Sequence, residues 1–243
     1  MIDTHCHLIP GVDDGPAEQT EALELARVLI ADGVTEVICT PHYSRLFTYP
    51  HEVAADRLAS LEEALSLAGL PLALTLAAEV HPALAVSAPV EELRRRSIAD
   101  RFVVVEVLPD SPGPLFAAAI DRLAETGMTP VFAHPERSRV VQRHPALLDA
   151  VRRDGGLVQV VAPSLLGRWG DDVREAAWRL VDTGRADLVG SDAHGVRRRR
   201  AHLREAADLI EARLSHAVAT ALTLETPRAV LDGSFERPDP GTY

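Results

Sequence analysis

Strand-type and helix-type segments alternate along almost the whole chain, and this alternation constrains the fold more than any other feature of the sequence. Apolar, β-branched runs such as RFVVVEV at 101–107 are followed by segments whose apolar residues recur at helical spacing. Glycines such as Gly33, Gly69 and Gly127 end the helical segments. Because strands that alternate with helices form parallel sheets, the sequence predicts an α/β fold.

The segments can be placed along the sequence. Strands are expected at about 1–7, 35–43, 72–80, 101–107, 129–137, 157–162 and 186–194, and helices at about 16–32, 51–68, 89–97, 114–126, 145–154, 171–183, 198–213 and 215–231. Seven such units predict a closed or nearly closed, TIM-like (β/α)7 barrel, and an open doubly wound sheet is the alternative. We expect a single domain over 1–243, with a loose tail from about residue 233.

Side chains that can bind metal ions lie where the predicted strands end. His5 and His7 form an H-x-H pair, and a strand places residues two apart on the same face. In a β/α barrel the carboxyl ends of the strands meet at the face that carries the active site. The nine candidate ligands are His5, His7, Asp14, His42, Glu79, Glu106, His134, Asp192 and His194.

Nine ligands are too many for one ion, because a catalytic ion takes three or four protein groups and leaves a position for water. Two or three divalent ions that share carboxylates fit the number. Imidazole and carboxylate ligands without thiolate suit Mn, Fe or Zn. A polynuclear site of this kind, in a chain without a redox motif, indicates hydrolysis of a phosphoester.

Two arginines near the predicted ligands suggest a phosphate substrate. Arg137 follows His134 in the sequence HPER, and Arg199 lies in the run RRRR at 197–200. A guanidinium group binds two phosphate oxygens at once, so these residues are candidates for substrate binding. The alternative for the arginine run is a solvated helix start. Neighbouring arginines in the run could also substitute for Arg199.

Bulk composition excludes several classes of function. The net charge of −11 argues against nucleic-acid binding, which needs a basic surface. All 25 basic residues are arginine, which excludes a lysine Schiff base and a P-loop lysine. There is no signal-peptide pattern and no apolar run long enough to span a membrane, so we expect a cytoplasmic protein without membrane insertion. The sequence predicts no particular oligomeric state.

The two cysteines, Cys6 and Cys39, lie in predicted buried strands and are expected to be core residues in a reducing compartment. Cys39 to Arg45 reads C-x5-R, the pattern of cysteine-dependent phosphatases. That chemistry needs a loop whose N–H groups bind phosphate around a thiolate. Pro41 removes one N–H and the loop has no glycine, so we do not expect a thiol mechanism.

A known family shares these motifs. The stretches MIDTHCHLIPGVDDG, CTPH, AAEV, VVVEV, HPER and SDAH, in this order, resemble the bacterial metal-dependent protein-tyrosine phosphatases of the PHP (polymerase and histidinol phosphatase) superfamily. Those proteins are encoded with capsule and exopolysaccharide genes. The resemblance implies a distorted seven-stranded barrel, the PHP fold, with Mn as the usual metal and up to three ions. The chain departs from the family pattern after CTPH, at Tyr43-Ser44-Arg45. The resemblance therefore does not define the outer pocket or the substrate preference.

The resemblance also implies how the ligands are shared. The implied sets are His5, His7, Glu79 and Asp192 for one ion, Glu79, Glu106 and His134 for a second, and Asp14, His42 and His194 for a third. It implies that Arg137 and Arg199 bind the phosphate.

The predicted function is that of a metal-dependent phosphomonoesterase acting on phosphotyrosine in a protein partner, in particular a bacterial tyrosine kinase of polysaccharide export. A metal-bound hydroxide would attack phosphorus in line. Asp13, Asp14 or a histidine could protonate the tyrosine leaving group, although phenolate is a fair leaving group without such help. One alternative is a small-molecule phosphatase such as a histidinol phosphatase. Another is a metal-stabilised regulator of a tyrosine kinase without catalysis.

Overall fold

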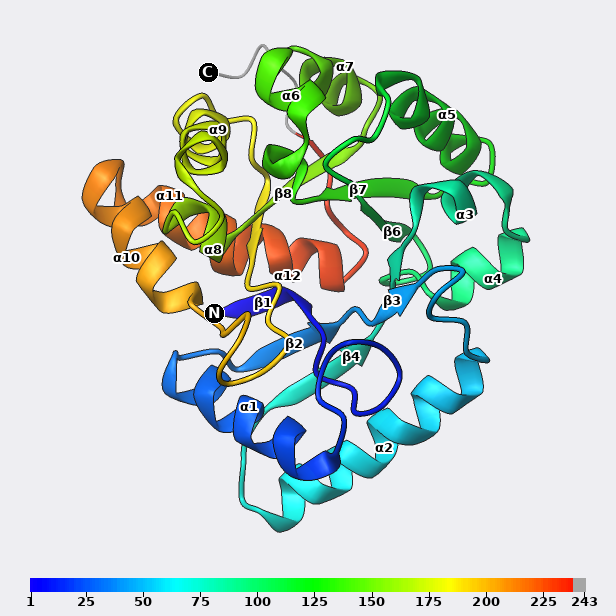
Figure 1. Ribbon diagram of the computed structural model, residues 1–243, viewed down its shortest axis with the longest axis vertical. Helices are drawn as coiled ribbons and strands as arrows, with labels where there is room; N and C mark the ends of the chain where they lie inside the picture. Colours follow the sequence, from blue (N-terminus) through cyan, green and yellow to red (C-terminus); the bar gives the residue numbers. More distant parts are fainter. Residues whose placement is uncertain (238–243) are drawn as a thin grey trace.

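The structure of the protein is a computed structural model that describes residues 1–237 of the chain. The strands lie in the middle of the molecule and the helices lie around them (Figure 1). The strands are β1 (Ile2–Cys6), β2 (Glu36–Cys39), β3 (His42–Tyr43), β4 (Ala73–Leu76), β5 (Glu79–Val80), β6 (Phe102–Glu106), β7 (Thr129–Ala133), β8 (Leu157–Val161) and β9 (Leu188–Gly190).

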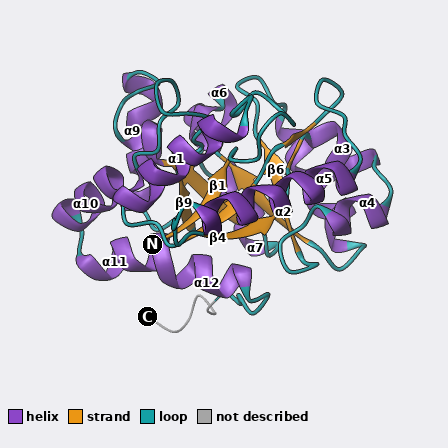
Figure 2. Cartoon of the chain, turned by 90° about the horizontal axis from the view of Figure 1, so that it is seen from below, coloured by secondary structure: helices purple, strands orange, loops and turns teal. Residues whose placement is uncertain are grey.

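Helices follow most of the strands. They are α1 (Gln19–Ala31), α2 (His51–Leu67), α3 (Pro82–Ser87), α4 (Val90–Arg95), α5 (Gly113–Ala124), η1 (Pro135–Arg137), α6 (Arg139–Arg143), α7 (Leu147–Arg153), α8 (Ala162–Leu165), α9 (Asp171–Asp182), α10 (Leu203–Arg213), α11 (His216–Thr220), η2 (Ala221–Glu225) and α12 (Thr226–Leu231). Turned by 90°, the molecule shows α11 and α12 below the strands and long loops above them (Figure 2). No helix in the described part of the chain is both long and apolar enough to cross a bilayer.

All strand ladders are parallel, as the alternating pattern predicts. The strands form two sheets, with the orders β1-β2-β4 and β3-β5-β6-β7-β8-β9. Between β1 and the segment after β9 there is one isolated bridge, from Cys6 to Ala193. The fold is therefore a mixed α/β fold with parallel sheets, and the ladders do not form the single closed sheet of seven strands that the sequence predicts.

The difference arises in two of the predicted strands. The strand expected at 35–43 is divided into β2 and β3, and the strand expected at 72–80 into β4 and β5, so each contributes to both sheets. Pro41 lies at the first division, and proline has no N–H for a ladder. The carbonyl of Pro41 instead accepts a bond from the N–H of Glu79 at 3.1 Å.

Two apolar clusters occupy the two faces of the strands. Along β6, Val103 and Val105 belong to the large cluster, to which the helices contribute, whereas Phe102 and Val104 belong to the smaller one. This alternation is that of strands buried on both faces. Glu106 continues the face of Phe102 and Val104, so its side chain stands at the end of the smaller cluster.

The helices and the tail differ from expectation in detail. The helix expected at 198–213 begins only at Leu203, because Arg199 has φ 49° and cannot continue a helix. The short helices α3, α6 and α8 were not predicted. The loose tail expected from about residue 233 is held as far as Arg237, which donates to Asp187 at 2.6 and 3.0 Å and to the carbonyl of Gly156. The remainder of that tail, 238–243, lies outside the described residues.

Candidate metal centre

The nine ligand-type side chains that the sequence singles out lie together at the ends of the strands. Their nitrogen and oxygen atoms form four overlapping groups, in each of which all atoms lie within 4.8 Å of one another. The groups are His7, Asp14, His42 and His194; His5, His134 and Asp192; His5, His7 and Glu79; and His42, Glu79 and Glu106. These groups differ in part from the implied sets, because Glu106 lies with His42 and not with His134.

Strand register and backbone turns position these residues. His42 and Glu79 are ladder partners at the first positions of β3 and β5. His134 directly follows β7 and Asp192 lies two residues after β9, and both have left-handed backbones, with φ of 41° and 53°. Side chains that leave their strands through such turns are redirected sharply, which brings residues from separate strands to one point.

Glu79 is the centre of the cluster and is fully buried. Its Oε1 lies 2.7 Å from His134 Nε2. Its Oε2 lies 3.0 Å from His42 Nδ1 and 3.4 Å from the Nε2 atoms of His5 and His7, yet has no hydrogen-bond partner in the described structure. Burial would raise the pKa of Glu79, but the surrounding imidazoles outweigh it and hold the pKa well below its usual range. Glu79 is therefore a buried carboxylate with one unused oxygen.

The imidazoles are oriented by bonds on their far side. His5 Nδ1 lies 2.7 Å from Gln159 Oε1, and His7 Nδ1 lies 2.6 Å from Asp13 Oδ2. Both rings thus direct Nε2 into the cluster, where the two Nε2 atoms stand 3.3 Å apart. Bonds of this kind fix the tautomer and angle of metal-binding histidines. Sequence reasoning missed Gln159, whose only signal was a polar residue within the apolar run LVQVVA.

Asp13 lies beside the cluster with both carboxylate oxygens engaged. Oδ2 contacts His7 Nδ1 and accepts from the N–H of His42 at 2.9 Å, and Oδ1 accepts from the N–H of Gly15 at 2.9 Å. Burial would raise the pKa of Asp13, but His7 and these N–H groups outweigh it and lower the pKa below its usual value. Both oxygens of Asp13 thus act as hydrogen-bond acceptors in this arrangement, and its role as one of the candidate proton donors stays a prediction.

Both candidate arginines reach Asp192. One nitrogen of Arg199, Nη2, lies 2.7 Å from each carboxylate oxygen, and Arg137 Nη1 donates to Oδ2 at 3.3 Å. Each arginine side chain is 23% exposed, so both lie at the boundary between the cluster and solvent. The other three members of the arginine run, Arg197, Arg198 and Arg200, are exposed and form no ion pair within the described residues. Arg199 is therefore the member of the run that faces the cluster.

The cluster opens to solvent on the side of Asp14. Asp14 is 47% exposed, whereas Glu79 and Asp192 are fully buried. A groove of about 510 Å³ adjoins this side, and its lining includes His194, Gly15 and Glu21. A molecule that approaches from solvent therefore meets Asp14 and the two partly exposed arginines before the buried Glu79 and Asp192.

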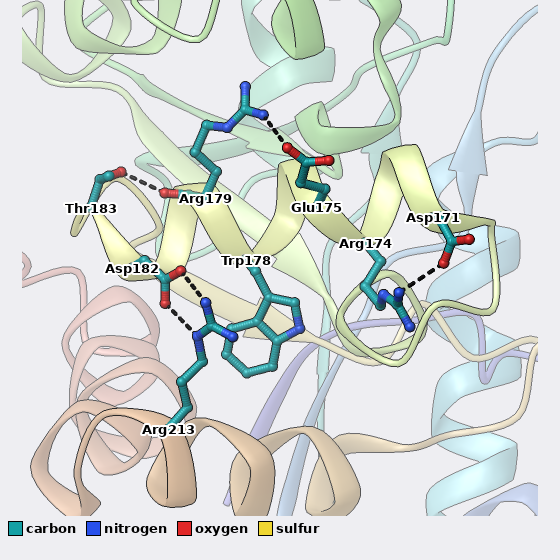
Figure 3. Close-up of a pocket in the computed structure, with 8 residues that line it drawn as sticks. All are labelled: Asp171, Arg174, Glu175, Trp178, Arg179, Asp182, Thr183 and Arg213. Atoms are coloured by element: carbon teal, nitrogen blue, oxygen red, sulfur yellow. Dashed lines mark hydrogen bonds and ion pairs between the residues drawn. The ribbon is translucent and has the colours of Figure 1, made fainter.

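Two other features of the described residues do not form a competing centre. A pocket lies along α9 (Figure 3), and its volume is about 480 Å³. Its arginines, Arg174 and Arg179 of α9 and Arg213 of α10, are each paired with an acidic side chain of α9. Cys39 is fully buried in β2, and burial raises its pKa well above the ordinary value. Such a thiol is not a thiolate at neutral pH, which agrees with the exclusion of a thiol mechanism.

Comparison with known proteins relates the chain to capsule proteins. The family model described as capsular polysaccharide synthesis, CpsB/CapC, matches residues 1–232. The chain is 32% identical over 214 residues to tyrosine-protein phosphatase YwqE of Bacillus subtilis, a match that covers 87% of this chain and 84% of YwqE. It is 28% identical over 205 residues to the putative tyrosine-protein phosphatase CapC of Staphylococcus aureus, covering 82% of this chain and 79% of CapC.

Comparison with solved structures leads to the same group of proteins. The chain matches a structure from the work on YwqE of Bacillus subtilis and CpsB of Streptococcus pneumoniae, described there as unique metal-dependent tyrosine phosphatases. The TM-score is 0.86 at 29% identity, over 99% of this chain and 98% of the other. A beta-aspartyl dipeptidase from Fervidobacterium islandicum matches with a TM-score of 0.59 at 15% identity, over 95% of this chain and 72% of the dipeptidase, which shows a shared fold alone.

Proposed function

Since the chain belongs to the CpsB/CapC family of capsular polysaccharide synthesis, we propose that it is a metal-dependent protein-tyrosine phosphatase. The observation that carries the proposal is the position of two arginines beside a cluster of nine ligand-type side chains. Hydrolysis of a phosphate ester requires an activated water that attacks phosphorus and cationic groups that bind the phosphoryl oxygens. This site offers residues for both tasks.

We propose that the nine clustered side chains hold two or three divalent ions, with Mn as the resident metal and Fe or Zn as alternatives. The Oε2 atom of Glu79 fits such ions, because it is a buried ligand atom without a hydrogen-bond partner among the described residues. The Nε2 atoms of His5 and His7, which face each other at 3.3 Å inside the cluster, are further ligand atoms. The donor set contains nitrogen and oxygen but no thiolate. Bound divalent ions supply Lewis-acid chemistry, which activates water and neutralises phosphoryl charge.

Arg137 and Arg199 bind the phosphoryl oxygens that face solvent. Both guanidinium groups lie at the rim and already contact a carboxylate, so they are held in place before substrate arrives. A guanidinium group matches a pair of phosphate oxygens, and a preorganised donor stabilises charge that develops in the transition state. Asp13 acts one step further out: it orients His7 and the backbone at His42.

The substrate that we propose is phosphotyrosine on a bacterial tyrosine kinase of polysaccharide export, and the family's link to capsular polysaccharide synthesis supports it. We place the reaction in the cytoplasm, which suits two free, buried cysteines. We also propose that the two sheets serve as one barrel-like wall of seven strand segments, because β2 with β3 and β4 with β5 are consecutive pieces of chain.

The proposal is tested by phosphate release from a phosphotyrosine peptide, with the purified chain stripped of metal and then supplied with Mn. We expect release only with added metal, and faster turnover of the peptide than of histidinol phosphate. If the chain hydrolyses no phosphomonoester with Mn, Fe or Zn, the proposed function is wrong. If it prefers histidinol phosphate, the small-molecule alternative replaces it.

A further inference from the structure

Arg137 lies between the candidate metal centre and an exposed indole. Its Nη1 donates to Asp192, and its Cζ stands over the ring of Trp169, 4.7 Å from the ring centroid. Trp169 is 38% exposed, and among the described residues it is the only Phe, Tyr or Trp side chain in the exposed class. In a chain with 4% aromatic residues, an exposed indole beside a phosphate-binding arginine is notable.

The loop that carries Trp169 is fixed by its backbone. It spans 166–170 between α8 and α9, and Gly167 and Gly170 have left-handed φ of 71° and 95°. The N–H of Arg168 donates to the carbonyl of Pro163 at 2.9 Å, and that of Gly170 to the carbonyl of Gly167 at 3.2 Å. A tight turn therefore presents Trp169 at the end of the sheet where β8 finishes, beside the centre.

The second tryptophan of the chain shows what an Arg–Trp pair does when it is only structural. Arg213 stands 4.8 Å from the centroid of Trp178 but donates two bonds to Asp182, at 2.8 and 2.7 Å (Figure 3). That pair joins α9 to α10. Arg137, in contrast, makes one longer bond, at 3.3 Å, so the indole of Trp169 contributes more to its position.

The geometry has a consequence for the leaving group. In a tyrosine phosphate the phenyl ring is separated from phosphorus by one ester oxygen. If Arg137 binds the phosphoryl group, the indole that packs on the same guanidinium lies next to the ring of the ester. Aromatic rings attract one another at such distances, and aryl groups gain from contact with a half-exposed indole.

We propose that Trp169 forms an aryl subsite that contacts the phenyl ring of phosphotyrosine and that it also positions Arg137. This inference rests on the proposed phosphatase function and adds the residue that distinguishes aryl from alkyl phosphates. The positioning role affects every phosphomonoester, whereas the ring contact affects only aromatic ones. The two roles are therefore separable by the choice of substrate.

The first test compares kcat/KM for a phosphotyrosine peptide and for a phosphoserine peptide of the same sequence. Trp169→Ala should lower the value for phosphoserine severalfold, and the value for phosphotyrosine by a further factor of roughly 3–10, as for the loss of one aromatic pair. Trp169→Phe should restore most of the preference. The matched control, Trp178→Phe, should leave the ratio of the two values unchanged.

The second test measures the binding of ligands that are not hydrolysed. In Trp178→Phe, Trp169 is the single tryptophan, and its fluorescence is followed as metal-loaded protein is titrated with phenylphosphonate, methylphosphonate or inorganic phosphate. We expect phenylphosphonate to change the emission well beyond the change caused by the other two. Equal changes with all three ligands, or an unaltered substrate ratio in Trp169→Ala, would overturn the aryl subsite while the phosphatase function stands. A wild-type protein that hydrolyses neither peptide would instead overturn the phosphatase function.

Discussion

Nη2 of Arg199 lies 2.7 Å from both carboxylate oxygens of Asp192, so that one nitrogen is shared between two acceptors. The other terminal nitrogen, Nη1, lies 3.5 Å from Asp14. Burial would lower the pKa of Arg199, but Asp192 and Asp14 outweigh it and raise the pKa above its already high value. The guanidinium is thus a fixed positive charge between a buried and an exposed carboxylate.

Replacing Arg199 should therefore strongly reduce phosphatase activity. We expect Arg199→Ala to lower kcat/KM on a phosphotyrosine peptide on the order of 10²–10³-fold with the metal content retained, as for the loss of a preorganised donor. Arg199→Lys should restore only part of it, because an ammonium cannot bind two oxygens in a fork. The exposed neighbour Arg198 is the matched control, and Arg198→Ala should be near wild type. Equal rates for Arg199→Ala and Arg198→Ala would show that neighbouring arginines can substitute for Arg199, which is the alternative that the sequence leaves open.

Asp13→Asn separates an orienting carboxylate from a proton donor. Because Asp13 orients His7, the variant should bind metal about 10–100-fold more weakly, as for other partners of metal-binding histidines. At saturating metal its pH–rate profile should keep the wild-type shape. Metal titration and the profile of kcat against pH are the measurements. Loss of the basic limb of the profile at saturating metal would instead identify Asp13 as the proton donor.

Glu79 should matter more for metal content than His42. Both residues lie in two of the clustered groups, but Glu79 is fully buried and its carboxylate contacts four histidines, whereas His42 is partly exposed. Glu79→Gln removes the charge but keeps the shape, and we expect it to lose more metal per chain than His42→Ala. Elemental analysis of both purified variants checks this. Equal metal content in the two would remove the central role of Glu79.

Metal removal should abolish activity, and thiol removal should not. We expect chelation to reduce hydrolysis to background and Mn to restore it, because the clustered side chains are proposed to serve as metal ligands and the attacking water is activated by the metal. Cys39→Ala should keep most of the rate, since the thiol is buried and its pKa is raised. An inactive but folded Cys39→Ala protein that tolerates chelator would reverse this assignment.

Gly190 is needed for the approach of β9 to β1. A Cβ at this position would stand 2.7 Å from His5 Cβ and 3.2 Å from His5 N. Gly190→Ala should therefore lower the free energy of unfolding by about 1–3 kcal/mol through overpacking and also weaken metal binding through His5. At Gly113, where a Cβ meets Leu147 only at 3.9 Å, the same change should not destabilise. Denaturant unfolding of both variants measures the difference.

More of the candidate site than of the detailed secondary structure could be predicted from the sequence. Glu106 and His134 were found because ligand-type residues at the ends of apolar strands are visible in sequence, and parallel strands bring such ends together. The division of the strand at 35–43 accompanies Pro41, whose carbonyl accepts from the N–H of Glu79. The late start of α10 accompanies the left-handed backbone of Arg199, whose carbonyl accepts from the N–H of His194.

Residues that contact the candidate ligands or arginines, without being ligands themselves, could not be predicted from the sequence. Gln159 orients the ring of His5, which lies 154 positions away, and Trp169 packs on Arg137. Neither belongs to a spacing pattern. The orientation of Arg199, and not of its three neighbours, toward the cluster is likewise a property of one turn.

Within residues 1–237, five non-glycine residues have left-handed backbones, and three of them belong to the centre: His134, Asp192 and Arg199. Such conformations cost on the order of 1–3 kcal/mol each for a residue with a side chain. Engineering for heat tolerance would therefore select glycine at these three positions, and each gain in melting temperature would remove a ligand or an arginine. Thermostable variants of this chain should be sought elsewhere, with these positions held fixed.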